Sequence, residues 1–242
     1  MKYEWFIGLR YLKAKRKQTF ISIITVISIA GVTVGVMALI VVLAVMSGFE
    51  KTLKEKILGT QAHLVVLEAS QAGMDGYEDV MRKVEEVKGV VSAAPFIVSQ
   101  VMLSSESNVF GVVLKGIDPD RVGKVTELAT NLKAGRLEDL KKDKAGEPPG
   151  IILGVELAKH LSVSLNDKIQ VISPLGTMTP IGMMPKMKRF RVEGIFYSGM
   201  YEFDNTMAYV SIKSAQKFFG MGDRVSGIEI KTNDIYQVKK IG

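Results

Sequence analysis

The most prominent feature of the hydrophobicity pattern is one long apolar run, because residues 20–49 contain no charged side chain. The hydrocarbon core of a bilayer is about 30 Å thick, so about 20 helical residues cross it. A cleaved signal peptide has an apolar region of only about 7–15 residues and a small-residue cleavage site, which this run does not offer. The pattern therefore predicts a transmembrane helix over 20–49. The helical spacing of Phe49, Leu53 and Ile57 predicts that this helix continues to about residue 58.

The residues before the apolar run follow a helical pattern with two different faces. Three apolar side chains share one face, and they are Trp5, Leu9 and Leu12. Three basic side chains share the opposite face, namely Arg10, Lys13 and Lys17. The pattern predicts an amphipathic helix over 1–19 on the cytoplasmic side, with its cationic face toward anionic lipid headgroups. Two interpretations stay open, a membrane anchor and a helix that a cytoplasmic partner moves.

The positive charge of the chain is concentrated before the apolar run. Residues 1–19 hold six basic side chains and one acidic one, and therefore five of the seven net positive charges. The positive-inside rule places the N-terminus in the cytoplasm and the residues after about 50 across the membrane. A domain-wide nucleic-acid surface would spread its basic residues over a folded face, so this class of function is excluded.

Small residues are spaced four apart within the predicted transmembrane helix. Gly31 and Gly35 lie in the motif GVTVG, and Ser28 and Ala38 extend the same stripe. Such stripes let two membrane helices approach closely. Glycine is also common in membrane helices, so helix packing and chance both stay open.

Beyond residue 60 the chain alternates between short strand-like and helix-like segments. Predicted strands cover 61–68, 95–103, 109–117, 167–173, 188–199 and 225–232. Predicted helices cover 75–90 and 154–163, and a strand leading into a helix covers 208–220. The polar segment 131–150 ends in Pro-Pro-Gly and predicts a connecting loop. This order predicts an α+β fold.

Residues that could carry catalysis are sparse. The chain has no cysteine, which excludes disulfides and cysteine-ligated metals. His63 and His160 are interpreted as structural residues, and Glu202 and Asp204 as solvated turn carboxylates rather than an acid–base pair. There is no GxxxxGK[ST] phosphate loop. We therefore predict a non-catalytic chain without a metal or cofactor of its own.

The segment SPLGTMTPIGMMPKMK, residues 173–188, contains three prolines, four methionines and no acidic residue. It has too many prolines for a core strand, and it is unusually apolar for a loop in water. Proline lowers the entropy lost on binding and discourages strand pairing, while methionine offers adaptable apolar surface. The segment predicts a protruding hairpin that binds an apolar partner. A hairpin without a partner, or one that dips into lipid, stays an alternative.

Two long segments carry a family resemblance. The stretch from YEWFIGLRYLK to KEKILG (3–59) and the stretch from GVELAKHL to SAQKFF (154–219) resemble the lipoprotein-releasing transporter permeases. These are the LolC and LolE type subunits of the wider MacB/FtsX-like permease family. The resemblance implies one membrane helix, a large periplasmic domain and then three further membrane helices, so the chain is expected to be the N-terminal portion of a longer permease.

The resemblance also implies partners and a location. Such permeases lie in the inner membrane of Gram-negative-type bacteria, and two permease subunits, identical or sister, work with two copies of a separate ATPase. ATP and magnesium are then expected on that ATPase. The assembly takes lipoproteins from the inner membrane and passes them to a periplasmic chaperone, LolA. The lipoprotein clients stay open.

The family pattern implies a division of the periplasmic part and a binding hook. A porter-like α+β subdomain is expected over 60–122 plus 224–242, and an inserted mostly-β subdomain over 123–223, with the hook at 173–188. The implied chaperone-binding residues of the hook are Pro174, Met178, Pro180, Ile181, Met183, Met184 and Pro185. The implied pad beside the hook is Gln170, Met187 and Lys188, of which Gln170 and Met187 depart from the expected residue types. Four basic residues are expected to meet acidic groups of the partner, namely Lys186, Lys188, Arg189 and Arg191.

Two alternative functions come from the same wider family. One is an FtsX-like signalling or scaffold subunit whose outer domain activates a cell-wall hydrolase. The other is a MacB-like efflux permease that works with a periplasmic adaptor. The hairpin rich in methionine and proline favours the lipoprotein-releasing branch over both.

Overall fold

The computed structural model describes residues 2–13, 19–68, 73–141, 146–179 and 182–233 of the 242-residue chain. The chain divides into two compact units, Met1–Leu53 and Lys54–Gly242.

The described residues of the first unit are all helical. Helix α1 covers Lys2–Lys13, which confirms this part of the predicted amphipathic helix, and residues 14–18 lie outside the described residues. Helix α2 runs without interruption over Thr19–Thr60, so its last seven residues belong to the second unit. Its 42 residues correspond to a length of about 63 Å at ~1.5 Å per residue.

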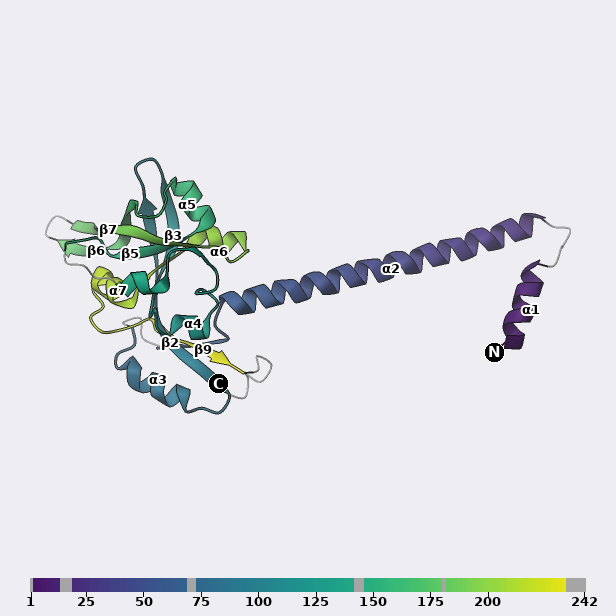
Figure 1. Cartoon of the computed structure of the whole chain (residues 1–242), viewed down its shortest axis with the longest axis horizontal. Helices are drawn as coiled ribbons and strands as arrows, with labels where there is room; N and C mark the ends of the chain where they lie inside the picture. Colours follow the sequence, from purple (N-terminus) through teal and green to yellow (C-terminus); the bar gives the residue numbers. More distant parts are fainter. Residues whose placement is uncertain (1, 14–18, 69–72, 142–145, 180–181, 234–242) are drawn as a thin grey trace. The chain divides into compact units, whose positions relative to one another are not determined.

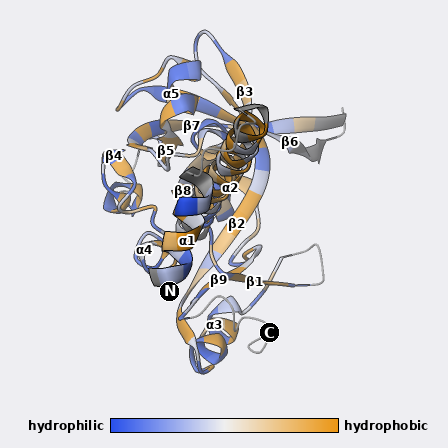
Figure 2. Ribbon diagram, turned by 90° about the vertical axis from the view of Figure 1, so that its right-hand side faces the viewer, coloured by the Kyte–Doolittle hydropathy of each residue, from blue (hydrophilic) through white to orange (hydrophobic). Residues whose placement is uncertain are grey.

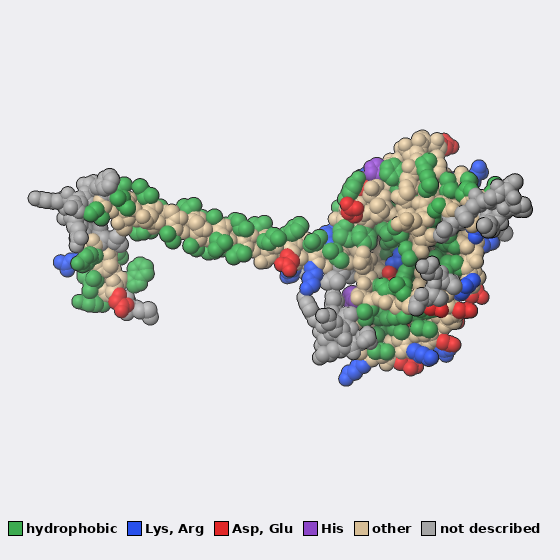
Figure 3. Space-filling view, turned by 180° about the vertical axis from the view of Figure 1, so that it is seen from behind, with side chains coloured by type: hydrophobic (Ala, Val, Ile, Leu, Met, Phe, Trp, Pro, Cys, Tyr) green, Lys and Arg blue, Asp and Glu red, His purple; other side chains and the backbone are tan. Residues whose placement is uncertain are grey.

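Helix α2 has the properties of a membrane-spanning helix. Within its segment Ile23–Lys54, an 18-residue stretch has a mean hydropathy of 2.8 and none of that stretch is buried, so the segment is long and apolar enough to cross a bilayer (Figure 3). Thr25 and Thr33 donate their hydroxyls to carbonyls one turn earlier, at 2.9 and 2.8 Å. These bonds satisfy polar groups that lipid cannot satisfy. At Gly31 and Gly35 an added Cβ would meet nothing within 4 Å, so this stripe is open, and its packing role stays a prediction.

The second unit is built on one mixed sheet (Figure 1). The nine strands among its described residues are β1 (Leu64–Leu67), β2 (Val90–Ser104), β3 (Val109–Ile117), β4 (Leu132–Ala134), β5 (Gly150–Gly154), β6 (Lys168–Thr179), β7 (Gly182–Phe196), β8 (Met207–Ser211) and β9 (Gly227–Thr232). The order is β1-β9-β2-β3-β8-β5-β7-β4, and β6 pairs with both β2 and β7. Only β3–β8 and β5–β7 are parallel among the described pairs.

Short helices cover the sheet and confirm the α+β prediction. They are α3 (Tyr77–Glu85), α4 (Val122–Val125), α5 (Val155–Leu161), α6 (Tyr201–Thr206), α7 (Ile212–Phe219) and the 3₁₀ helix η1 (Leu137–Lys141). Helix α7 shows how local sequence sets an element. Its N-cap Ser211 accepts a hydrogen bond from the Ser214 backbone, and Gly220 ends it at φ 73°, where glycine carries no Cβ penalty.

The buried side chains form two hydrophobic clusters. The larger one joins α3, α5 and α7 to the sheet, and within it Phe190 and Phe218 meet edge to face at 6.1 Å. The smaller one includes Phe196 and Tyr209, whose ring centroids lie 5.2 Å apart. Burial raises the pKa of the Tyr209 hydroxyl.

The sheet runs through both subdomains expected from the family pattern, and their boundaries at 122 and 224 stay a prediction.

The prediction of a connecting loop over 131–150 is partly wrong. It contains β4, η1 and the first residue of β5, and Leu137 and Leu140 are buried. The many lysines of this stretch make it polar on average. This average obscures the pattern of two leucines, three residues apart, that are buried in the smaller cluster. The strands predicted over 95–103 and 109–117 are confirmed as parts of β2 and β3, and the strand predicted over 225–232 is confirmed from Gly227 onward as β9.

Candidate partner-binding hairpin

Strands β6 and β7 form a long antiparallel hairpin that ends in the predicted hook. Their register runs from Lys168↔Arg191 to Thr179↔Gly182, with an irregularity between Ser173 and Thr177. The outer part of the hairpin projects from the rest of the sheet (Figures 1 and 2). Residues 180–181 at its turn lie outside the described residues.

The side chains of the hook that the structure describes are exposed. Met184 is 53% exposed, and Pro174 and Pro185 are also exposed. The other four predicted hook side chains lie outside the described ones, and they are Met178, Pro180, Ile181 and Met183. Methionine is usually buried, so an exposed methionine beside two exposed prolines presents apolar surface that a partner can cover.

The predicted pad does not occupy a single face of the hairpin. The Gln170 amide nitrogen lies 3.2 Å from the Met187 sulfur, and Met187 is 56% exposed. Lys188 points to the opposite face, because successive side chains of a strand alternate, and its Nζ lies 5.9 Å from the ring centroid of the buried Phe190. The structure therefore brings Gln170 and Met187 together and places Lys188 apart from them.

Besides Lys188, two further basic residues that were expected to meet a partner are engaged within the chain. Lys186 donates to the Phe219 carbonyl at 3.0 Å, where the C-terminal end of α7 favours a cation. Arg191 pairs with Glu193 at 2.6 Å and Glu147 at 2.7 Å, and these hydrogen bonds raise the pKa of its guanidinium.

Arg189 is the basic side chain of this set best placed to meet a partner. It is exposed and forms no ion pair with the residues that the structure describes. It lies on the same face of β7 as Met187, two positions away, so a cation and an apolar side chain stand side by side on this face.

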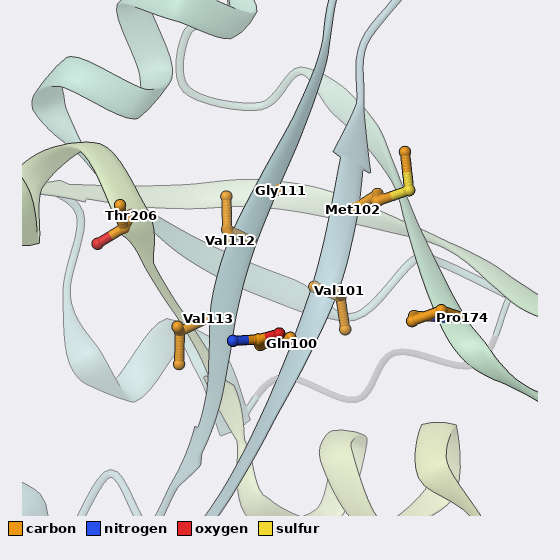
Figure 4. Close-up of a pocket in the computed structure, with 8 residues that line it drawn as sticks. All are labelled: Gln100, Val101, Met102, Gly111, Val112, Val113, Pro174 and Thr206. Carbon is orange, nitrogen blue, oxygen red and sulfur yellow. The ribbon is translucent and has the colours of Figure 1, made fainter.

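An apolar hollow of about 460 Å³ lies at the base of the hook (Figure 4). Residues of β2 and β3 form its floor, Pro174 of β6 and Thr206 of α6 border it, and none of the described residues that line it is charged. At Gly111 in this floor an added Cβ would meet nothing within 4 Å. The hollow extends the apolar character of the hook toward the sheet.

The interpretation of Asp204 as a solvated carboxylate is wrong. Asp204 is 1% exposed, and its Oδ1 accepts hydrogen bonds from the backbone N–H and the hydroxyl of Ser198, both at 2.8 Å. Glu202, by contrast, is exposed. The two carboxylates therefore lie in different environments, one in water and one buried. The buried Asp204 fixes the backbone at Ser198 through its hydrogen bonds.

The two histidines have structural neighbours. His160 stacks on Phe110 with ring centroids 5.1 Å apart, and its Nδ1 lies 2.6 Å from the Asn205 side-chain oxygen. His63 lies just before β1, where its Nδ1 accepts from the Thr232 backbone N–H at 3.1 Å. Within the described parts of the chain, no three His, Asp or Glu side chains are grouped to hold a metal.

Comparison with known proteins identifies a family that the chain matches. Residues 25–241 match the family described as MacB-like periplasmic core domain. The chain is 38% identical over 231 residues to the lipoprotein-releasing system transmembrane protein LolC of Neisseria meningitidis serogroup B, covering 96% of this chain and 54% of that protein. It is 24% identical to the lipoprotein-releasing system transmembrane protein LolE of Haemophilus influenzae, covering 100% of this chain and 58% of that protein. The chain thus spans about half the length of the curated relatives it matches.

Among solved structures, the chain is similar to the extracellular domain of the noncanonic ABC-type transporter YknZ from Gram-positive bacteria. The TM-score is 0.49 at 17% sequence identity, covering 72% of this chain and 81% of that one.

Proposed function

This chain belongs to the family defined by the MacB-like periplasmic core domain, as a permease of the LolC/LolE type, and from this premise we propose that it serves an ABC transporter that releases lipoproteins from the inner membrane. In this proposal α2 anchors the chain in the membrane and the second unit works in the periplasm. The hairpin of β6 and β7 captures the chaperone that receives the lipoprotein. ATP and magnesium act on a separate cytoplasmic ATPase, and a second permease subunit completes the assembly.

The observation that carries the proposal is the exposed apolar surface of the hairpin. Met184 and Met187 are each more than half exposed on β7, beside Pro174 and Pro185. A lipid-carrying chaperone has an apolar mouth, and covering an apolar side chain contributes about 1.5–3 kcal/mol. Methionine adapts its shape to such a mouth, which suits a transient contact.

We predict that changing Met184 and Met187 to aspartate lowers chaperone capture at least tenfold. The variant loses two apolar contacts and would bury two unpaired carboxylates in the interface, and a tenfold loss needs only about 1.4 kcal/mol. The measurement is a pull-down of a purified periplasmic lipoprotein chaperone by the full chain in detergent.

The matched control for this experiment is Val109→Asp. Val109 is 52% exposed on β3, which resembles the exposure of the two methionines, but it lies on another hairpin. This control is expected to capture the chaperone like the unaltered chain. Equal capture by the Met184→Asp/Met187→Asp variant would refute the role of the hairpin. Capture of a periplasmic adaptor or a cell-wall hydrolase in place of the chaperone would support the efflux or signalling alternative.

The proposed location gives a second prediction. The chain has no cysteine, so a single introduced cysteine is the only thiol that a maleimide can label. We expect Val109→Cys to react with a membrane-impermeant maleimide once the outer membrane is opened. Tyr3→Cys, at a position that is 75% exposed, is expected to react only after the inner membrane is permeabilised. Labelling in the opposite order would reverse the proposed topology.

A further inference from the structure

The last turn of α2 is attached to the sheet domain at two points. Its Gly59 carbonyl accepts a hydrogen bond from the Glu127 backbone N–H at 3.0 Å, and the Glu127 carboxyl carbon would lie 2.7 Å from a Cβ added at Gly59. Lys56 Nζ lies 3.5 Å from the Ser198 carbonyl. A side chain added at position 59 would meet only the end of the exposed Glu127 side chain, so the backbone hydrogen bond between Glu127 and Gly59 is the fixed part of the first attachment.

The second attachment point is itself held firmly. Ser198 donates its backbone N–H and its hydroxyl to the buried Asp204 carboxylate, both at 2.8 Å. The preceding residue, Tyr197, donates its backbone N–H to the Asn131 carbonyl at 2.8 Å. A buried carboxylate with two hydrogen bonds fixes a chain corner strongly, because opening it would leave a charge unsatisfied.

Strand β7 connects this corner to the hook. It ends at Phe196, two residues before Ser198, and it begins at Gly182 in the hook. Its 15 residues extend over about 45–50 Å at ~3.3 Å per residue. Strand β5 pairs with β7 on one side, and β4 and β6 also pair with it, so the strand is supported along its length.

We propose that these contacts form a latch that fixes the last turn of α2 to the end of β7. The latch residues are Lys56, Gly59, Glu127 and Ser198, and Asp204 is a positioning residue that acts through Ser198. Strand β7 then carries displacements of the last turn of α2 to the hook. The physical link stands on the contacts alone, while its use in moving a bound chaperone rests on the proposed function.

The latch predicts a single distance between the last turn of α2 and the hook. Spin labels at Ile57→Cys and Met187→Cys, in the full chain in nanodiscs, report this distance, because the chain has no other cysteine. Both positions are exposed, at 41% and 56%. We expect one narrow distance distribution. Adding Glu127→Pro with Lys56→Ala is expected to widen the distribution at least twofold, because proline has no N–H to donate to the Gly59 carbonyl and alanine removes the contact to Ser198.

Two controls separate the latch from general loosening. Glu147→Ala removes an ion pair to Arg191 in the middle of β7 without touching the latch, and it is expected to leave the distribution unchanged. A label pair at Val109→Cys and Met187→Cys lies within the sheet domain and is expected to stay narrow in the latch variant. A broad distribution in the unaltered chain would overturn the proposal. So would an unchanged width in the latch variant, or equal widening of the second label pair. None of these readouts involves a chaperone, so they fail or succeed independently of the proposed function.

Discussion

Replacing Lys115 with methionine is expected to lower the free energy of unfolding by about 3–5 kcal/mol, because the Glu229 carboxylate then stays buried without its cation. Lys115 of β3 and Glu229 of β9 form an ion pair whose side chains are only 13% and 9% exposed. The Lys115 nitrogen also lies over the Phe96 ring, 5.5 Å from the ring centroid, in a cation–π contact. Removing one partner of such a pair costs far more than the pair contributes, since the desolvation of the remaining charge is no longer offset.

Hydrogen exchange of the sheet amides in the full chain in detergent measures this loss. Trp5 lies in α1 and the chain has no other tryptophan, so tryptophan fluorescence would not report on the sheet.

The double variant Lys115→Met/Glu229→Leu is expected to recover most of the stability, because two apolar side chains of similar volume need no partner. Lys159→Met is the matched surface control. Its side chain is 64% exposed beside Glu156, and it is expected to cost about 0–1 kcal/mol. A Lys115→Met variant as stable as the Lys159→Met variant would contradict the argument.

The sequence pattern predicted those elements whose hydrophobic pattern is long or clearly bounded by turn residues. Helix α2 follows from a long apolar run, because a helix satisfies all its backbone hydrogen bonds within a bilayer, and α7 follows from the segment 208–220, in which Gly220 was expected to end a helix. Strands β2 and β3 follow from β-rich segments around a short turn. In each case the signal lies within neighbouring residues, so the rest of the fold was not needed to read it.

The parts that the sequence did not predict depend on contacts between distant residues. Asp204 was interpreted as solvated because its burial is set by Ser198 and the packing of α6, and nothing near it in sequence signals a buried acid. The ion pair of Lys115 and Glu229 joins residues 114 positions apart. The glutamate between two isoleucines in the strand GIEIKT was the available signal, but the partner of this glutamate cannot be read from one sequence.

The candidate site was predicted in the same uneven way. The position and apolar character of the hook followed from composition, whereas the separation of Lys188 from Gln170 and Met187 depends on the register of β6 and β7. A shift by one residue would have reversed which side chains share a face. The engagement of Lys186 by the end of α7 likewise needed the packed structure.

Replacing Gly135 with alanine is expected to lower the free energy of unfolding by more than about 3 kcal/mol and to detach β4 from β7. Gly135 has φ +80°, a left-handed conformation that costs an alanine about 1–2 kcal/mol. An added Cβ would also lie 2.7 Å from the Gly194 Cα and 2.9 Å from the Glu193 carbonyl carbon. These are backbone atoms of β7, so neither can move aside without displacing the strand.

The matched variant Gly146→Ala separates these two contributions. Gly146 has φ +90°, but an added Cβ there would meet nothing within 4 Å, so only the backbone strain of about 1–2 kcal/mol applies. The difference between the two variants is therefore the cost of pushing β4 away from β7. Strand β4 pairs Leu132 with Phe196, two residues before the latch at Ser198, so hydrogen exchange should rise first at this end of β7 in Gly135→Ala. If both variants lost the same stability, or if exchange rose evenly over the whole sheet, the close contact at Gly135 would not support the end of β7.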